Sequence, residues 1–442
     1  MKLIINEEID KNTKVINKLE DSNSSTSSSS NSLQESPYIY KRARDITILE
    51  IIKIIENKSG FNSFIKELEN GFFVYIKNDN TLQLLNEKFN PIIEVKDYRD
   101  KIISICDAFQ DSGRNKKKNK KEEELKIVLV SNRSLFLTIF DLDKLNTYTK
   151  ELEVSHIYGF KSIEMKKNNY ILVGKKCTSY FTDLFLSKEP RENRLFEEKS
   201  FFNSIKINEN VFALVSNKIF PGGEDELLFY NLKRKKLLQN EIKGYSFTMS
   251  QNGLELMPKL EAETKTSRIL LCACKRYTKD QSNGILLVNP QLGENKEVEE
   301  PFYNTGNFEV NCFCPLFNVK EKNGNKPLLD EETIIYPEQD PDNLVFEETN
   351  YFLVGGFDGD KREGKIRLYK IIYGEKSYNT KIKYVQDILF EKKKGIEDFN
   401  GAINCLIQSK TTGNILANCY NGNIYLLTPP NLNYYLEEDK NK

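Results

Sequence analysis

The chain has 442 residues, with 65 Lys and Arg against 65 Asp and Glu, so its formal net charge is zero. This balance excludes a globally basic nucleic-acid-binding protein and a strongly acidic protein, while a local charged patch stays open. The single histidine, His156, argues against metal sites built on two or three His ligands and leaves one candidate for a His-based catalytic triad.

The N-terminal segment, residues 1–44, is predicted to be a disordered arm. Its Ser/Asn-rich tract at 21–32 cannot bury enough apolar surface to offset the entropy of ordering. Apolar residues between Ile5 and Leu19 recur at roughly helical spacing, so a short helix stays open. Acidic residues among the first ten argue against a secretory signal.

Two further features bear on the compartment. No stretch approaches the roughly 18 uncharged apolar residues of a membrane-spanning helix, so no membrane insertion is expected. The eight Cys are too sparse for a disulfide scaffold in a chain of this length. We therefore expect a cytoplasmic protein, with the nucleus as the alternative.

From residue 45 onward, short apolar or alternating runs of four to eight residues are separated by Asn, Gly, Lys and Asp. This pattern is typical of strands and turns, and no long segment with helical periodicity interrupts it. The runs group in fours, except in the last set, which has three. The sets cover residues 64–95, 102–154, 160–198, 202–242, 245–300, 308–390 and 402–427.

An additional run at 45–55 precedes the first set and can supply the strand that the last set lacks. Such an exchange closes a ring of sheets and pairs strands that would otherwise be left at an edge. The sequence therefore predicts an all-β fold over residues 45–430. We expect a seven-bladed β-propeller of four-stranded antiparallel blades, closed by an N-terminal strand.

The turns between the second and third strands of three sets resemble a WD repeat. The segments are 78–86 (NDNTLQLLN), 364–370 (GKIRLYK) and 421–427 (NGNIYLL). The pairs Phe140-Asp141 and Tyr230-Asn231 stand where the family has its Trp-Asp dipeptide, and the sequence contains no Trp. His156 resembles the His of the family's Gly-His dipeptide, although its partner Asp is absent near 175–178, which favours a structural histidine.

Aromatic residues gather where the chain enters the inner strand of each set. Most are expected to pack between blades in place of Trp, and a minority to line the face where the inner strands begin. In propellers of the kind this chain resembles, that face usually carries the partner site, and an exposed aromatic on a rigid rim is a suitable anchor. The candidate partner-binding residues are Phe61, Tyr158, Phe202, Tyr245, Phe308 and Phe399.

Two cysteine pairs, Cys272/Cys274 and Cys312/Cys314, are the most metal-like feature. Residues i and i+2 of a strand share a face, so the two pairs could together form a four-thiolate zinc site. Structural zinc sites, however, prefer Cys-x2-Cys spacing on turns, and these Cys lie in apolar runs where a thiol acts as a small hydrophobe. We expect inert packing, with no metal and no cofactor.

Three other segments are assigned to loops and a tail. The glycine-rich segment 355–364 lacks the residues of a P-loop or an EF-hand and is expected to be a β-turn. Long insertions are predicted at about 110–125, which holds a mixed charge run, and at 318–350, whose acidic second half is a hypothetical flap for a basic partner. A charged tail is predicted at 431–442.

These features favour a non-catalytic protein-interaction scaffold or adaptor, whose partners are other proteins and not nucleic acids. A structural subunit of a large assembly, of ciliary or vesicle-coat type, stays open. So does a propeller-type enzyme, which would need carboxylates or metal ligands converging on the centre of the ring. One architecture hosts many functions, so the pattern alone does not identify the partner or the oligomeric state.

Overall fold

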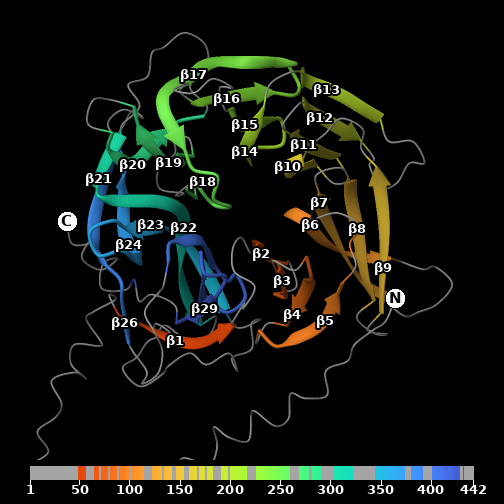
Figure 1. The fold of residues 1–442 in the computed structure, drawn as a ribbon, viewed down its shortest axis with the longest axis horizontal. Coiled ribbons are helices and arrows are strands. Elements are labelled where there is room, and N and C mark those ends of the chain that lie inside the picture. Colours follow the sequence, from red (N-terminus) through yellow and green to blue (C-terminus); the bar gives the residue numbers. More distant parts are fainter. Residues whose placement is uncertain are drawn as a thin grey trace, which may run out of the picture.

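The computed structural model describes residues 48–432 with gaps. The longer gaps are 56–63, 114–121, 142–145, 154–158, 183–190, 217–224, 259–267, 291–301, 322–343, 374–379 and 392–400. The described elements are strands, and their sheets follow one another around a ring (Figure 1). This arrangement confirms an all-β, propeller-like architecture. We call each sheet unit of the ring a blade and number the blades in chain order.

The first three blades are separate four-stranded antiparallel sheets in sequential order. Blade one contains β2 (Phe64–Glu67), β3 (Phe73–Ile76), β4 (Leu82–Leu85) and β5 (Pro91–Val95). Blade two contains β6 (Ile102–Gly113), β7 (Glu122–Ser131), β8 (Ser134–Asp141) and β9 (Asn146–Glu153). Blade three contains β10 (Gly159–Lys166), β11 (Asn169–Gly174), β12 (Cys177–Thr182) and β13 (Arg191–Glu197).

Blades four and five are joined because one strand, β17, contributes to both. Blade four contains β14 (Phe201–Lys206), β15 (Val211–Ser216), β16 (Asp225–Asn231) and β17 (Lys236–Phe247). Blade five contains β18 (Leu254–Leu256), β19 (Leu270–Arg276), β20 (Asn283–Val288) and β21 (Phe302–Gly306). The end of β17 and the whole of β18 both pair with β19, so the inner strand of blade five is interrupted between Phe247 and Leu254.

The remaining strands form blade six and a five-stranded last blade. Blade six contains β22 (Phe308–Glu321), β23 (Leu344–Asp358), β24 (Glu363–Ile372) and β25 (Lys381–Asp387). The last blade has the order β26-β1-β29-β28-β27. Its strands are β1 (Ile48–Ile55), β26 (Leu389–Glu391), β27 (Ile403–Gln408), β28 (Ile415–Cys419) and β29 (Ile424–Leu427).

The N-terminal strand β1 lies between two strands from the C-terminal part of the chain. It is antiparallel to β29, with Ile55 opposite Ile424, and parallel to β26, with Ile48 opposite Leu389. The pairing places β1 next to β29 in the last blade, while closure of a seven-bladed ring by this strand stays a prediction. The parallel strand β26 was not predicted, because the predicted set 308–390 assigns residues 389–390 to the preceding blade.

The core lies between the blades. The middle strands are buried on both faces, as in β3, β15 and β28, because alternate side chains point toward the two neighbouring blades. One cluster packs β3 and β4 of blade one against β28 and β29 of the last blade, so the ends of the described chain meet. Leu432 is also buried against the last blade, so core packing reaches beyond residue 430.

Several predicted boundaries differ from the structure. The predicted set 245–300 ends before the outer strand of blade five, which is Phe302–Gly306, and residues 291–300 of that set lie outside the described residues. The predicted set 308–390 extends too far, because the chain passes at Ile388 from β25 to β26 in the neighbouring sheet. Both insertions are shorter than predicted, because β6 and β7, and likewise β22 and β23, continue as paired hairpins into them.

The arm at 1–44, most of the charge run at 114–121, and the tail beyond Leu432 lie outside the described residues. Within the part of the chain that the structure describes, no helical segment has the length and apolar character needed to cross a bilayer.

Candidate functional site

Three of the six predicted aromatic anchors lie among the described residues, and three do not. Phe202 is 8% exposed and Phe308 is 1% exposed, so both rings pack in the core and neither can be an exposed anchor. Tyr245 is half-buried against Phe247 and Phe302, at centroid distances of 6.2 and 5.7 Å. The other three candidates, Phe61, Tyr158 and Phe399, lie outside the described residues, and their partner role stays a prediction.

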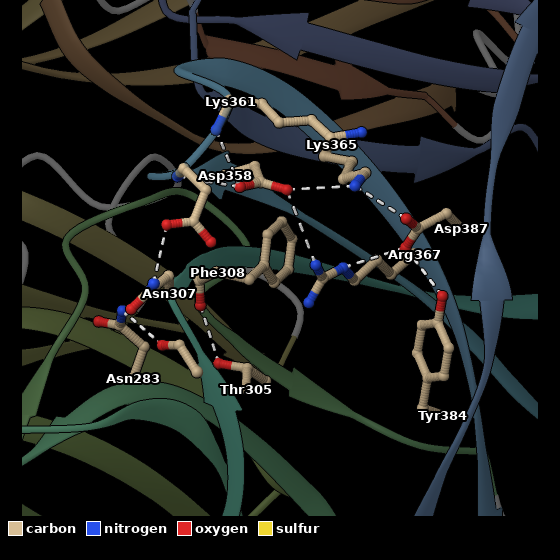
Figure 2. A network of polar contacts seen from close by, with 12 residues as sticks. Asn283, Thr305, Asn307, Phe308, Asp358, Lys361, Lys365, Arg367, Tyr384 and Asp387 are labelled. Carbon is tan, nitrogen blue, oxygen red and sulfur yellow. Dashed lines mark hydrogen bonds and ion pairs between the residues drawn. The ribbon is translucent and has the colours of Figure 1, made fainter.

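Phe308 begins the inner strand of blade six, and its buried ring contacts a network of charged side chains (Figure 2). The Arg367 guanidinium lies over its ring, with Cζ 4.1 Å from the ring centroid. Cation–π contacts of this kind hold an arginine over a ring face even where little water reaches it.

The network consists of two acidic and two basic side chains from three strands of blade six. Lys365 Nζ lies 3.1 Å from Asp358 Oδ2 and 2.8 Å from Asp387 Oδ2. Arg367 Nε lies 3.1 Å from Asp387 Oδ1. The four charges alternate in sign, so each carboxylate faces a cation (Figure 2).

This arrangement sets the pKa values of the network. Burial raises the pKa of both Asp358 and Asp387, but the hydrogen bonds and charge of Lys365 outweigh it, and both pKa values lie below their usual range. Burial lowers the pKa of Lys365, while its two carboxylate partners outweigh that effect and raise it. All of these groups therefore stay charged near neutral pH, and the network fastens β23, β24 and β25 together.

The centre of the ring contains a loop that the sequence did not predict. The central loop, Thr248–Gly253, interrupts the inner strand of blade five just before β18 (Figure 1). The Gln251 side chain bonds both backbone groups of Ile65 in blade one: Nε2 donates to the carbonyl at 2.7 Å, and Oε1 accepts from the amide at 3.3 Å. The loop thus connects blade five to blade one.

The same loop bonds three more inner strands. Asn252 Nδ2 donates to the Leu406 carbonyl of the last blade at 3.0 Å, and the Asn252 carbonyl accepts from the Phe313 amide of blade six at 2.9 Å. Asn203 Nδ2 of blade four donates to the Thr248 carbonyl at 3.0 Å. Inner strands are sheet edges with unpaired backbone groups. The central loop satisfies four of those groups and ties the blades across the ring.

The two cysteine pairs belong to different clusters. Cys272 and Cys274 pack between blades four and five, and Cys312 and Cys314 pack between blade six and the last blade. The four thiols are therefore not brought together as the zinc alternative requires. Among the described residues no group of three or more His, Cys, Asp or Glu side chains is arranged to hold a metal ion.

The glycine-rich segment 355–364 is a turn only at 359–362, because residues 355–358 belong to β23 and residues 363–364 to β24. β23 and β24 are joined through residues 359–362, with Arg362 in the left-handed region at φ 56°. Gly355 has a packing role, since a Cβ there would lie 2.8 Å from Cys312 Sγ and 2.7 Å from Ile403 Cγ2. The absence of a side chain thus lets blade six approach the last blade.

The acidic insertion is partly ordered as a hairpin. Glu347 and Glu348, predicted as part of an acidic flap, lie in β23 opposite Asn318 and Phe317 of β22. The flap prediction is wrong for these two residues, because backbone pairing continues beyond residue 318. The prolines that resist pairing lie in 322–343, outside the described residues.

A groove of about 740 Å³ lies between blades three and four, on the face where the inner strands end. Its lining is mixed in character. The lining residues are Asn169, Tyr180, Asn193, Arg194, Leu195, Glu209, Asn210, Tyr230, Leu232, Lys233 and Lys235. The lining includes three cationic side chains and one carboxylate, so its net charge is positive.

The basic turn between β16 and β17, Lys233–Lys235, contributes Lys233 and Lys235 to one wall of the groove. All three of its side chains are exposed. The run KRKK at 233–236 is visible in the sequence, but the strand pattern of the set 202–242 assigns no role to it. A short basic run becomes part of a binding surface only when a second blade lies opposite, and the sequence pattern does not show which blades face each other.

Neither the comparison with protein-family models nor that with curated proteins finds a match for this chain. Among solved structures, the β-propeller domain of Cps50 (Swd1) from Myceliophteria thermophila is 9% identical, with a TM-score of 0.48 over 86% of this chain and 99% of that chain. A chain of the Mitotic Checkpoint Complex is 7% identical, with a TM-score of 0.48 over 91% and 96%. The C-terminal WD40 domain of Sif2 is 9% identical, with a TM-score of 0.42 over 83% of this chain and 81% of that chain.

The features that resemble WD repeats are recovered in this chain's own structure. The segment 78–86 includes β4, the third strand of blade one, and the segment 364–370 lies within β24, the third strand of blade six. The segment 421–427 includes β29, the third strand of the last blade counted from β27. All three resembling segments therefore contain residues of the third strand of their blade, whereas only 78–86 and 421–427 also cover a described part of the preceding turn. The architecture is that of a WD-repeat-like β-propeller.

Proposed function

We propose that the protein is a non-catalytic scaffold that binds other proteins through the outer surfaces of a seven-bladed ring. The observation that carries this proposal is the central loop. It joins the inner strands of blades one, four and six and of the last blade to blade five. A ring fastened in this way holds its surface turns in fixed positions, and pre-ordered surfaces lose less entropy when a partner binds.

Closure of the ring by β1 is part of the proposal. The pairing of β1 with β29 and β26 supports it, as does the shared cluster between blade one and the last blade. A second contact joins the same two blades. Glu67 at the end of β2 accepts hydrogen bonds from the Lys410 amide at 2.8 Å and from Ser409 Oγ at 2.9 Å.

The test is native purification of the full chain from its own cells, followed by cross-linking and mass spectrometry. We expect a reproducible set of proteins in fixed stoichiometry, with cross-links to surface turns of the ring. Purification of the chain alone at every salt concentration tested would contradict the proposal.

A companion experiment addresses the alternative of a structural subunit. The chain is expressed without partners, and its mass is measured by light scattering after size-exclusion chromatography. A folded, soluble species is expected for a scaffold. Aggregation that only co-expression relieves would favour the structural subunit.

A further inference from the structure

We propose that the groove between blades three and four binds an acidic peptide segment of a partner protein. This inference rests on the proposed scaffold function and names the partner class of one surface. The groove has two walls, one from β13 in blade three and one from the turns at 207–210 and 232–235 in blade four.

Charge is the first argument. Lys233 and Lys235 line the groove, and within the described part of the chain neither side chain forms an ion pair. Arg194 on the opposite wall interacts with Glu192, with 3.7 Å between Nε and Oε1, and both side chains are exposed. Lys233 and Lys235 are therefore available to carboxylates of a ligand, and such charge complementarity selects partners.

The remaining lining favours a peptide over a nucleic acid. Tyr180 and Tyr230 supply aromatic surface, and Leu195 and Leu232 supply apolar surface. Amide side chains, such as that of Asn193, can both donate and accept, as a peptide backbone requires. Nucleic acids are held through many phosphate contacts along an extended basic surface, whereas this groove is bounded and small.

The basic turn is held in a fixed shape. The Leu232 amide donates to the Asn210 carbonyl of the neighbouring turn at 2.8 Å, and the Arg234 amide donates to Asn231 Oδ1 at 2.9 Å. Lys235 completes the turn in the left-handed region, at φ 52°. The cations therefore stand on an ordered backbone, so little ordering is required when a ligand binds.

The experiment measures binding of a fluorescein-labelled decapeptide of Glu with one central Tyr to the purified full chain, by fluorescence anisotropy. The test variant is Lys233→Glu/Lys235→Glu. The matched control is Lys381→Glu/Lys383→Glu, which reverses two exposed lysines on β25, outside the groove. Thermal melting of each variant establishes that it is folded, which is expected because all four positions are exposed.

We expect saturable binding that weakens as salt increases, a loss of at least about tenfold in the test variant, and no change in the control. Equal affinity of the wild type and the test variant would overturn the proposal. So would tighter binding of a labelled ten-nucleotide single-stranded DNA than of the peptide. If native purification still yields stoichiometric partners while the peptide does not bind, the groove assignment fails and the scaffold stands.

Discussion

Gln251 and Ile65 lie 186 residues apart in the chain, yet the side-chain amide of Gln251 bonds both the amide and the carbonyl of Ile65. Gln408 does the same for Phe317, with Oε1 accepting from its amide at 2.6 Å and Nε2 donating to its carbonyl at 3.1 Å. A glutamine presents one donor group and one acceptor, so it imitates a neighbouring strand for one residue. Backbone groups on inner strands are satisfied in this way without another sheet.

Replacing Gln251 with Ala should destabilise the ring. The change removes two hydrogen bonds and leaves partly buried backbone groups of Ile65 without their partner, which costs about 1–3 kcal/mol. The free energy of unfolding in urea measures this loss. Asn193→Ala, an exposed amide truncation, is the control and should change stability by less than about 0.5 kcal/mol. Equal stability of the two variants would mean that the central loop does not fasten the ring.

Replacing Lys365 with Met should destabilise blade six by on the order of 2 kcal/mol near neutral pH. Asp358 and Asp387 would then lack their shared cation; the expected loss is below that of a fully buried pair because Asp387 is 30% exposed. Urea unfolding of the wild type and the variant gives the difference. Lys361→Met, in the exposed turn beside the network, is the matched control.

The same pair of proteins predicts a pH dependence. The pKa values of Asp358 and Asp387 are lowered in the folded state, so their stabilisation is present above the unfolded value of about 4 and is lost as pH falls through the folded values. The raised pKa of Lys365 gives stabilisation that is present below about 10 and is lost as pH rises through the folded value. The difference between wild type and Lys365→Met should therefore be largest between about pH 5 and 9 and shrink below pH 4. A difference that grows on acidification would contradict the assigned charges.

The strand pattern was predictable because it depends on local residues. Short apolar runs such as 73–76 and 82–85 can be recognised from a few neighbouring residues, and turn residues mark where each run ends. The three WD-like turns were found for the same reason. Boundaries were less certain where a hairpin extends past its apolar part, as in Asn318 opposite Glu347, since polar residues pair as readily when their backbones are aligned.

The candidate site was less predictable because it depends on contacts between distant segments. The polar run between Phe247 and Leu254 is visible as an interruption of a strand, but its contacts with Ile65 and Leu406 join segments that are far apart in the chain. The aromatic at an inner-strand entry can face a partner or a neighbouring blade. Phe308 is buried beside Arg367, and this orientation depends on the packing of blade six, which the local sequence does not show.

The cysteine pair of blade five should behave as packing. Burial raises the pKa of the Cys274 thiol, which disfavours the thiolate that zinc requires. Replacing both Cys272 and Cys274 with Ala should cost about 1–2 kcal/mol, as for small core changes. Urea unfolding measures that cost, and metal analysis of the purified wild type accompanies it. Stoichiometric zinc that disappears in the double variant would overturn the packing assignment.

The role of β1 is tested by two truncations. Removing residues 1–40 leaves β1 intact and should leave the melting temperature unchanged, because the described contacts of the last blade begin at Ile48. Removing residues 1–55 deletes a strand that pairs with both β29 and β26, and the backbone of Ile424–Leu427 would become a free sheet edge.

Loss of that pairing should lower the melting temperature by on the order of 5–10 °C and promote association through the new edge. Differential scanning calorimetry measures the first effect, and light scattering at two protein concentrations measures the second. Adding a synthetic peptide of residues 45–55 to the shorter protein should restore part of the lost stability, since the peptide can occupy the vacated position beside β29. Truncations with the same melting temperature, and no effect of the peptide, would show that the ring does not depend on its N-terminal strand.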